Sequence, residues 1–574
     1  MDTFKTPVAR LARLFRASRD AWRAKALDKQ QRLRAARVKI RDLEASRAYW
    51  KNRALAAQGG GPPAASEATP VGAAQEPDAA ARQLLRLPPP GHRHSLLVIQ
   101  LTLQMFLSAG LGSRGVPRVL SLLAPWMPVS LPAHTTVLNW VYRCGLAILL
   151  QPPQRREDWI YIADHTLELG TSKCLVILGI PAARLLETGY SPSHRAMQVL
   201  AVKVTTHSTG EWVATVLREV AERTGVPVQI VADHGSDLHK GITLFRREQT
   251  TDCVETYDIS HRIATLLKAE LQPDARWQTF LAHCKRTLAS FQQTDLAFLL
   301  PPRQRTKARF MHVDTHVEWA QNLLAYQERG DFSAVRPTCV LTVAARDHLR
   351  DRLGVARVRP LHVLLGHRHP DKAAFCEAIQ AASDLQLTDL DDAFWDLADT
   401  GRARFLEGFA WASAYREDLA IYAQMMEQSK AIQSVLKSEG LHAGVCASLQ
   451  STLAPRTALA PRAARFTDRV LEQVEVQAAK IPPGATWLAS SDIIESVFGK
   501  YKTFTARGPL KEIGRLVLAI PAFLTDLTGP LIHEAMTSVR TLDVEHWVKA
   551  HLGDSMLARR RQAFKAPKLD MKTA

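Results

Sequence analysis

Two short stretches of the sequence share one arrangement of residues, an apolar run that ends in Ala-Asp-His and then turns polar. They are "WIYIADHTLELG" at residues 159–170 and "VQIVADHGSDLHKG" at residues 228–241. An aspartate that directly follows a buried strand projects from the carboxyl edge of a sheet while its backbone stays fixed. We therefore predict that Asp164 and Asp233 lie close together at one such edge.

The chemistry expected of two adjacent aspartates is the binding of a divalent metal. Neighbouring carboxylates repel each other unless a cation lies between them, and Mg²⁺ or Mn²⁺ prefers oxygen ligands. A pair of such ions can stabilise both the attacking and the leaving oxygen of an in-line phosphoryl transfer. Two carboxylates rarely suffice for two ions, so we expect a third.

The best candidate for the third carboxylate is Glu495 in "SSDIIESVFGKYK". At helical spacing Glu495 shares a face with Asp492 and Lys502, opposite the apolar residues of the same stretch. Lys502 on that face would contact a phosphate. We predict that Asp164, Asp233 and Glu495 are the catalytic residues and hold two Mg²⁺ or Mn²⁺ ions.

Each of these carboxylates also has a structural interpretation. An aspartate at the end of a strand is often a turn former. Asp492 and Glu495 have the spacing of a capping box, in which Glu495 would bind the backbone of Asp492. The repetition of Ala-Asp-His together with the downstream glutamate favours catalysis.

Four further residues are predicted to support the site. His165 and His234 follow the two aspartates, but neighbours on a strand point to opposite faces, so we expect them to pack or to orient ligands. Asp258 and His261 in "YDISHRIA" follow the last strand near the same edge. For Asp258 a helix N-cap is an equal alternative.

The sequence offers little reason to expect zinc or disulfides. In "HVDTHVEW", His312 and His316 would be one helical turn apart without a clear third ligand. The seven cysteines are scattered without a C-x-x-C pair, which argues against a zinc ribbon and a disulfide framework. We expect a reducing, cytoplasmic setting.

The elements that must position the carboxylates alternate in type over residues 157–262. Strand-like runs at 159–163, 173–180 and 199–206 precede an amphipathic helix at 211–223 and two more strands at 226–232 and 253–257. Three strands in an antiparallel meander, followed by a fourth that returns through a helix, give the strand order of the ribonuclease H-like fold. The predicted fold class is an α/β ribonuclease H-like core with a mixed five-stranded sheet.

The rest of the core is separated from this part by a long helical segment. Residues 263–486 look almost wholly helical and are predicted to form an all-α insertion. Residues 487–530 carry the helix with Glu495 and complete the core. Residues 531–574 are predicted to be a helical segment with a basic tail.

The N-terminal part is predicted to bind DNA. Residues 1–57 read as a basic helix or coiled coil, and residues 58–93 as a disordered linker rich in Gly, Pro and Ala. Residues 94–150 have the pattern of a helix-turn-helix, with a structural helix pair as the alternative. The residues expected to face DNA are Arg114, Arg118, Thr135, Thr136, Asn139 and Arg143.

The charge of the whole chain points to the same partner. A formal net charge of +18 attracts polyanions, of which nucleic acid is the leading candidate. The insertion adds a basic cluster that is predicted to clamp phosphates, made of Arg303, Arg305, Lys307 and Arg309. The sequence has no run of eighteen apolar residues and no apolar leader at its N-terminus, so neither a membrane span nor a signal peptide is expected.

Taken with its motifs, the chain resembles the D-D-E transposases of bacterial insertion sequences. The resemblance covers most of the chain and is carried by "IADH", "VADHGSDL", "YDISHRIATLLK" and "SSDIIESVFGKYK". The distance from Asp233 to Glu495 is 495 − 233 = 262 residues, which is similar to the subgroup with a helical insertion before the glutamate.

The resemblance implies a function as well as a fold. It implies that Asp164, Asp233 and Glu495 are the catalytic triad, that the partners are the terminal repeats of an element and target DNA, and that the protein acts as a dimer or larger assembly near the bacterial nucleoid. Two alternatives share the same residues. One is a ribonuclease H-like nuclease that cuts without joining, and the other is an inactive or domesticated DNA-binding protein.

Overall fold

The chain divides into two units, Met1–Asp78 and Ala79–Ala574. The computed structural model describes residues of the second unit. The described residues are 86–126, 129–167, 169–249, 252–304, 310, 313–330, 332–335, 338–508 and 510–564. The predicted basic helix, most of the linker, the end of the basic tail and the residues Arg305, Lys307, Arg309 and His312 lie outside them.

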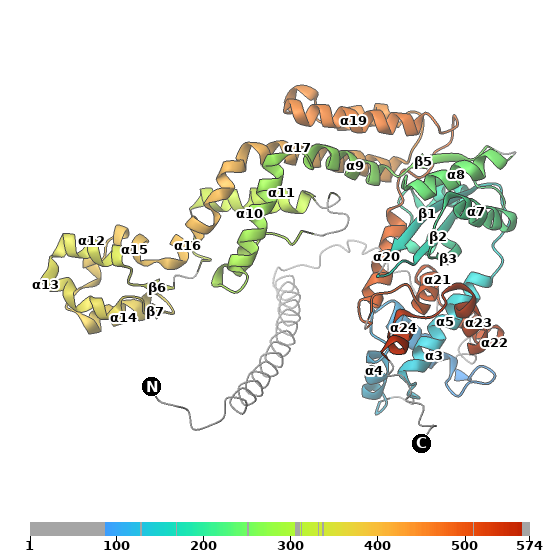
Figure 1. Cartoon of the computed structure of the whole chain (residues 1–574), viewed down its shortest axis with the longest axis horizontal. Coiled ribbons are helices and arrows are strands. Elements are labelled where there is room, and N and C mark those ends of the chain that lie inside the picture. The colour runs from blue at the N-terminus through green and yellow to red at the C-terminus, as the bar shows by residue number, and fades with distance from the viewer. Residues whose placement is uncertain are drawn as a thin grey trace, which may run out of the picture. The chain divides into compact units, whose positions relative to one another are not determined.

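The fold contains a mixed five-stranded sheet (Figure 1). Its strands are β1 (Trp159–Leu167), β2 (Lys173–Pro181), β3 (Gln198–Thr205), β4 (Gln229–Ala232) and β5 (Val254–Tyr257), in the order β3-β2-β1-β4-β5. β1, β2 and β3 pair antiparallel, whereas β4 lies parallel to both β1 and β5. This confirms the predicted sheet, and the arrangement is compatible with a ribonuclease H-like core.

Helices cover both faces of the sheet, which explains why its strands are apolar almost throughout. Along β1, Trp159, Tyr161 and Ala163 pack with α7 (Gly210–Thr224) and α8 (Ser236–Glu248). Ile160 and Ile162 pack in the cluster that contains α5 (His134–Leu150), α20 (Asp492–Thr505) and α21 (Ala519–Leu524). The alternation therefore assigns each residue of a strand to one helical layer.

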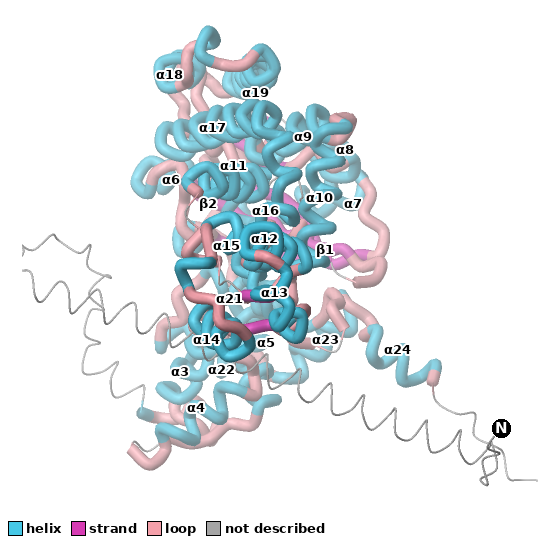
Figure 2. The backbone as a smooth tube through the Cα atoms, turned by 90° about the vertical axis from the view of Figure 1, so that its left-hand side faces the viewer, coloured by secondary structure: helices cyan, strands magenta, loops and turns pink. Residues whose placement is uncertain are grey.

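The segment between β5 and α20 is largely helical, as predicted (Figure 2). Its helices of ten residues or more are α9 (Ile259–Leu271), α10 (Ala275–Phe291), α11 (Val313–Arg329), α12 (Val343–Leu353), α14 (Lys372–Ala382), α16 (Thr400–Phe409), α17 (Arg416–Glu439) and α19 (Pro461–Ala478). Residues 339–398 add a small separate core around the two-residue strands β6 (Cys339–Val340) and β7 (Arg368–His369). Among the described helices, none is both long enough and apolar enough to cross a membrane.

The helices at the two ends of the described chain pack together. α3 (Leu96–Leu107), α4 (Gly115–Leu123) and α5 share one cluster of buried side chains with α22 (Gly529–Ser538) and α23 (Thr541–His551). Residues 94–150 therefore share a core with the C-terminal helices, through the buried side chains of α5. The DNA-binding domain expected at residues 94–150 stays a prediction.

Gly145 marks the closest contact in this packing. A Cβ atom built on Gly145 would lie 1.5 Å from the backbone oxygen of Leu518, which precedes α21. We expect Gly145→Ala to lower the free energy of unfolding by about 2 kcal/mol or more, because backbone must move to admit the methyl group.

Chemical denaturation of the full chain checks this prediction, with Gly499→Ala as the matched control. Gly499 lies in the middle of α20, and a Cβ atom added there would have no other atom within 4 Å. The control should be neutral or stabilising by up to about 1 kcal/mol. Equal stability of Gly145→Ala and wild type would contradict the close packing of α5 on Leu518.

Candidate active site

Three aspartates occupy equivalent positions on three adjacent strands. Ala163 of β1 is paired with Ala232 of β4, and Ala232 is paired with Tyr257 of β5. The next residue in each strand direction is an aspartate, namely Asp164, Asp233 and Asp258. The parallel register therefore brings together the two aspartates that were predicted to meet, and adds Asp258 beside them.

The position of Asp164 differs from the prediction in one respect. β1 continues to Leu167, so Asp164 lies inside a strand and not at its end. The reason is that β2 pairs with β1 along this whole length, with Asp164 opposite Val176. Only the parallel neighbour β4 stops, and its end opens space beside Asp164.

The same alternation shows which face the aspartates share. Val231 packs on the side of the sheet that contacts α20. Asp233 is two residues further along, and side chains two residues apart in extended chain share a face. Ile162 and Asp164 have the same relation in β1. By this alternation, both carboxylates lie on the face of the sheet that packs with α20.

A set of buried hydrogen bonds brings the start of α20 to this edge. The side-chain amide of Gln229, inside β4, donates to the carbonyl oxygen of Leu488 at 2.8 Å and accepts from the Leu488 N–H at 3.2 Å. The N–H of Ile259 donates to the carbonyl oxygen of Ala489 at 3.0 Å. These bonds fix the segment before α20 against β4 and the start of α9.

Asp258 completes this connection. Its carboxylate caps α9 by accepting from the N–H groups of Ser260 at 2.8 Å and His261 at 3.3 Å, and it also accepts a hydrogen bond from the hydroxyl of Ser491. Burial raises the pKa of Asp258, although the Ser491 hydroxyl opposes this effect. The alternative interpretation as an N-cap is therefore correct for Asp258, which positions α20, while His261 contributes a backbone N–H.

Glu495 does not form the capping box that the sequence allows. The N–H of Asp492 donates to the hydroxyl of Ser490 at 3.1 Å, and the Asp492 carboxylate binds Lys437 of α17 at 2.7 Å. α20 buries Ile494, Val497 and Tyr501, as predicted from its periodicity. Glu495 remains on the other face, close enough to Asp258, Asp492 and Asp233 to interact with them electrostatically.

The carboxyl groups of Asp164 and Glu495 both have raised pKa values. Burial raises the pKa of Asp164 well above its ordinary value, and repulsion by Asp233 and Glu495 adds to this. Burial raises the pKa of Glu495 to about 7, with Asp258 and Asp492 contributing and Lys502 opposing. A divalent cation is the kind of group that would relieve this mutual repulsion.

The donor set of this cluster suits a hard divalent cation, because all its ligands are carboxylate oxygens. The arrangement is looser than a preformed metal cage. Among the described residues, the ligand atoms of His234, His239 and Glu255 all lie within 4.8 Å of one another. The oxygens of Asp164, Asp233 and Glu495 do not meet this limit.

His165 belongs to a separate polar group on the opposite face of the sheet. The Nε2 atom of His165 lies 3.1 Å from the hydroxyl of Ser208, and the nearby Asp237 binds Lys173 at 3.1 Å. Burial lowers the pKa of His165, although Asp237 opposes this. This placement agrees with the alternation argument that turned His165 away from the metal ligands.

The ring of His234 lies against two aromatic rings. Its ring centroid is 4.0 Å from that of Tyr257 and 4.6 Å from that of His239. Burial lowers the pKa of His234 to about 4, and the positive charges of His239, Lys480 and Arg262 add to this. His239 and Glu255 were not predicted from the sequence, because Glu255 lies in a different strand from His234.

The residues predicted to face DNA fall into two groups. The exposed ones are Arg114, which directly precedes α4, Arg118 of α4, Thr135 of α5, Arg303 and Lys502. Thr136 and Asn139 are half-buried. Arg143 is engaged within the protein, because its guanidinium donates to the carbonyl oxygens of Val539 and Met536, each at 2.5 Å. Arg143 therefore joins α5 to the end of α22, and its contact with DNA stays a prediction.

No protein-family model and no curated protein matches the sequence. Among solved structures, the chain is similar to the Drosophila P element transposase strand transfer complex, at 11% sequence identity and a TM-score of 0.30, over 75% of this chain and 92% of that chain. A likeness at this level does not specify an activity, so the carboxylate cluster itself has to carry the proposal of function.

The raised pKa of Glu495 predicts how stability depends on pH in metal-free buffer. Between the ordinary pKa of 4.5 and about 7, the unfolded chain ionises Glu495 while the native state keeps the proton, so stability falls as pH rises. We expect Glu495→Gln to raise the midpoint of thermal unfolding at about pH 8, and this gain to shrink towards zero at about pH 5.

Thermal unfolding in the presence of a chelator measures this difference, with Glu472→Gln as the control. Glu472 lies on the exposed face of α19. Its substitution should change the midpoint by a similar small amount at both pH values. A gain for Glu495→Gln that is the same at both pH values would contradict the raised pKa of Glu495.

The structural role of Arg143 predicts a loss of stability upon its removal. Arg143→Met leaves two carbonyl oxygens without their donor, which should cost about 2 kcal/mol of unfolding free energy. Arg118→Met, on the exposed side of α4, should leave stability within about 0.5 kcal/mol of wild type. If Arg143→Met unfolds like wild type in denaturant but binds DNA more weakly, Arg143 contacts DNA as the sequence predicts.

Proposed function

We propose that this chain is a DNA transposase that cuts and rejoins DNA strands by divalent-metal-dependent phosphoryl transfer. The observation that carries the proposal is the cluster of Asp164, Asp233 and Glu495. These residues come from two parallel strands and from a helix 262 positions further along the chain (495 − 233), yet they interact electrostatically. A purely structural cluster of acids would be costly without charge compensation.

The three carboxylates are the residues that would hold Mg²⁺ or Mn²⁺. When bound, such ions stabilise negative charge on the attacking and leaving oxygens of a phosphodiester. The protein supplies rigidity, because Asp164 lies within β1, where it is paired with Val176 of β2. Glu495 lies on a helix whose start is hydrogen-bonded to β4 and Asp258. Lys502 supplies a positive charge near Glu495, where a DNA phosphate would approach.

Exposed basic residues around the fold are the proposed contacts with DNA. A groove of about 600 Å³ runs between the start of α5 and the end of α20, and its lining includes Arg114, Arg507 and Arg515. Arg515 is paired with Glu545, and Arg507 lies over the ring of Phe504, whereas Arg114 is exposed at the start of α4. Because two ends of an element must be joined at once, a dimer or larger assembly on DNA is part of the proposal.

The test is a cleavage and strand-transfer assay with DNA from both flanks of the reading frame. Wild type with Mg²⁺ or Mn²⁺ should cut these fragments and join pre-cleaved ends to a target plasmid. Asp164→Asn and Glu495→Gln should lower both activities by about 10³-fold or more, since a metal ligand is lost, and should keep DNA affinity nearly intact.

Asp526→Asn is the matched control for this assay. Asp526 is an exposed carboxylate that pairs with Arg195 at 2.9 Å, so its substitution should leave cleavage and joining unchanged. Cleavage without joined product under either metal would favour a nuclease. DNA binding by a wild-type protein that never cleaves would favour an inactive or domesticated DNA-binding protein.

A further inference from the structure

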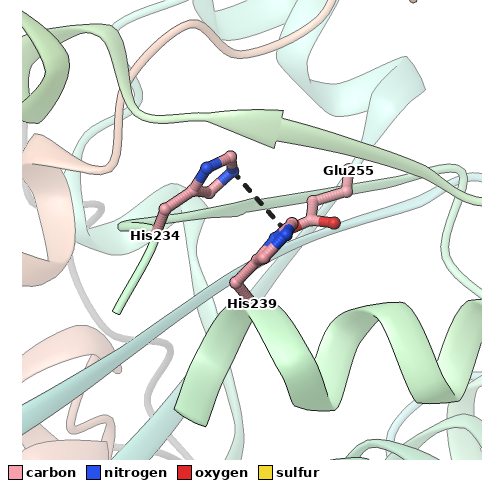
Figure 3. Close-up of side chains that lie close together, drawn as sticks. All are labelled: His234, His239 and Glu255. Carbon is pink, nitrogen blue, oxygen red and sulfur yellow. Dashed lines mark hydrogen bonds and ion pairs between the residues drawn. The ribbon is translucent and has the colours of Figure 1, made fainter. Parts of the chain in front are cut away.

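A second group of metal-ligating side chains lies at the other face of the sheet. His234 is in the turn after β4, His239 is in the first part of α8, and Glu255 is in β5 (Figure 3). Glu255 is paired with Ile230 of β4, which packs with α7 and α8. Residues in register share a face, so Glu255 points away from the face that carries Asp233.

Glu255 is a buried carboxylate at the centre of this group. Its side chain is 5% exposed, and its Oε1 atom lies 2.7 Å from Nδ1 of His239 and 3.5 Å from Nε2 of His234. Arg246 is further away, with 3.8 Å from its guanidinium to Oε2, and it also donates to the carbonyl oxygen of Cys253. Both imidazoles therefore converge on one carboxylate oxygen.

Hydrogen bonding within the group is incomplete. The bond between His239 and Glu255 satisfies one oxygen of the carboxylate, but the buried Nε2 atom of His234 has no hydrogen-bond partner among the described residues. A buried polar atom without a partner costs about 1–3 kcal/mol. The observed contacts thus account for the position of His239 but leave the Nε2 atom of His234 without a hydrogen bond.

Two imidazoles and one carboxylate are the ligand set of open zinc sites in proteins. The ligand atoms of His234, His239 and Glu255 all lie within 4.8 Å of one another. Ligands of a tetrahedral zinc ion, at about 2.1 Å from the metal, are about 3.4 Å apart. The separations of 2.7 Å and 3.5 Å from the Glu255 oxygen to the two imidazole nitrogens bracket this value. His239 is 52% exposed, which gives an ion access from solvent.

We propose that His234, His239 and Glu255 bind one Zn²⁺ ion, at a site distinct from the carboxylate cluster. The ion links the turn after β4 to β5 and to α8. Because His234 directly follows Asp233, the linkage restrains the backbone that carries this aspartate. The argument for zinc does not rest on the proposed transposase activity, since the zinc ligands lie on the opposite face of the sheet from the carboxylate cluster.

Zinc binding to the full chain tests the proposal. After dialysis against a chelator, wild type should take up one equivalent of Zn²⁺ in a titration followed by calorimetry and by metal analysis, and Zn²⁺ should raise its unfolding temperature. His239→Ala should bind Zn²⁺ more weakly by well over tenfold, because even the loss of a group that orients a ligand costs roughly 10–100-fold. His239 is exposed, so this variant should fold, which circular dichroism checks.

Three controls distinguish this site from zinc binding elsewhere on the chain. His207→Ala removes an exposed histidine outside the trio and should bind Zn²⁺ like wild type. Asp164→Asn should also bind Zn²⁺ like wild type, whatever its effect on DNA cleavage. Co²⁺ in place of Zn²⁺ should give the intense visible absorption of a four-coordinate site in wild type and not in His239→Ala.

The proposal fails if wild type takes up no stoichiometric Zn²⁺, or if His239→Ala binds Zn²⁺ as tightly as wild type. It also fails if Asp164→Asn, and not His239→Ala, abolishes binding, since the ion would then belong to the carboxylate cluster. None of these readouts uses DNA, so a failure of the zinc site and a failure of the proposed DNA chemistry are distinguishable.

Discussion

Repulsion between carboxylates held side by side is the constraint on which the rest of the structure depends. The parallel register of β1, β4 and β5 puts Asp164, Asp233 and Asp258 at equivalent positions. Asp258 is compensated by two backbone N–H groups and the Ser491 hydroxyl. Among the described contacts, the Asp164 carboxylate accepts a hydrogen bond from the backbone N–H of His165, while burial and repulsion by Asp233 raise its pKa.

The hydrogen bond between Asp258 and Ser491 also helps to bring Glu495 to the sheet, although Glu495 is far from Asp233 in the sequence. Glu495 follows a long helical insertion, and closing so long a loop costs little more entropy than closing a shorter one. The position of Glu495 therefore depends on the hydrogen bonds at the C-terminal end of the insertion. Gln229 binds Leu488, and Asp258 binds Ser491, so the sheet edge that carries the aspartates also receives the helix that carries the glutamate.

Patterns with a local physical cause could be predicted from the sequence. Apolar runs indicated the five strands, and alternation within a strand placed His165 on the face opposite Asp164. Partners that depend on distant elements could not be predicted. The periodicity of α5 does not reveal that α22 covers Arg143, and the continuation of β1 past Asp164 depends on the length of β2. His239 and Glu255 meet only because β5 lies beside β4.

The most direct test of the central claim is the location of bound Mn²⁺ in crystals of the full chain. Anomalous diffraction identifies the ion without relying on activity or on the correct DNA sequence. We expect Mn²⁺ between the carboxylates of Asp164, Asp233 and Glu495, and none there in crystals of Asp164→Asn. Mn²⁺ bound elsewhere, with this cluster empty at saturating metal, would contradict the claim that these carboxylates form a catalytic metal site.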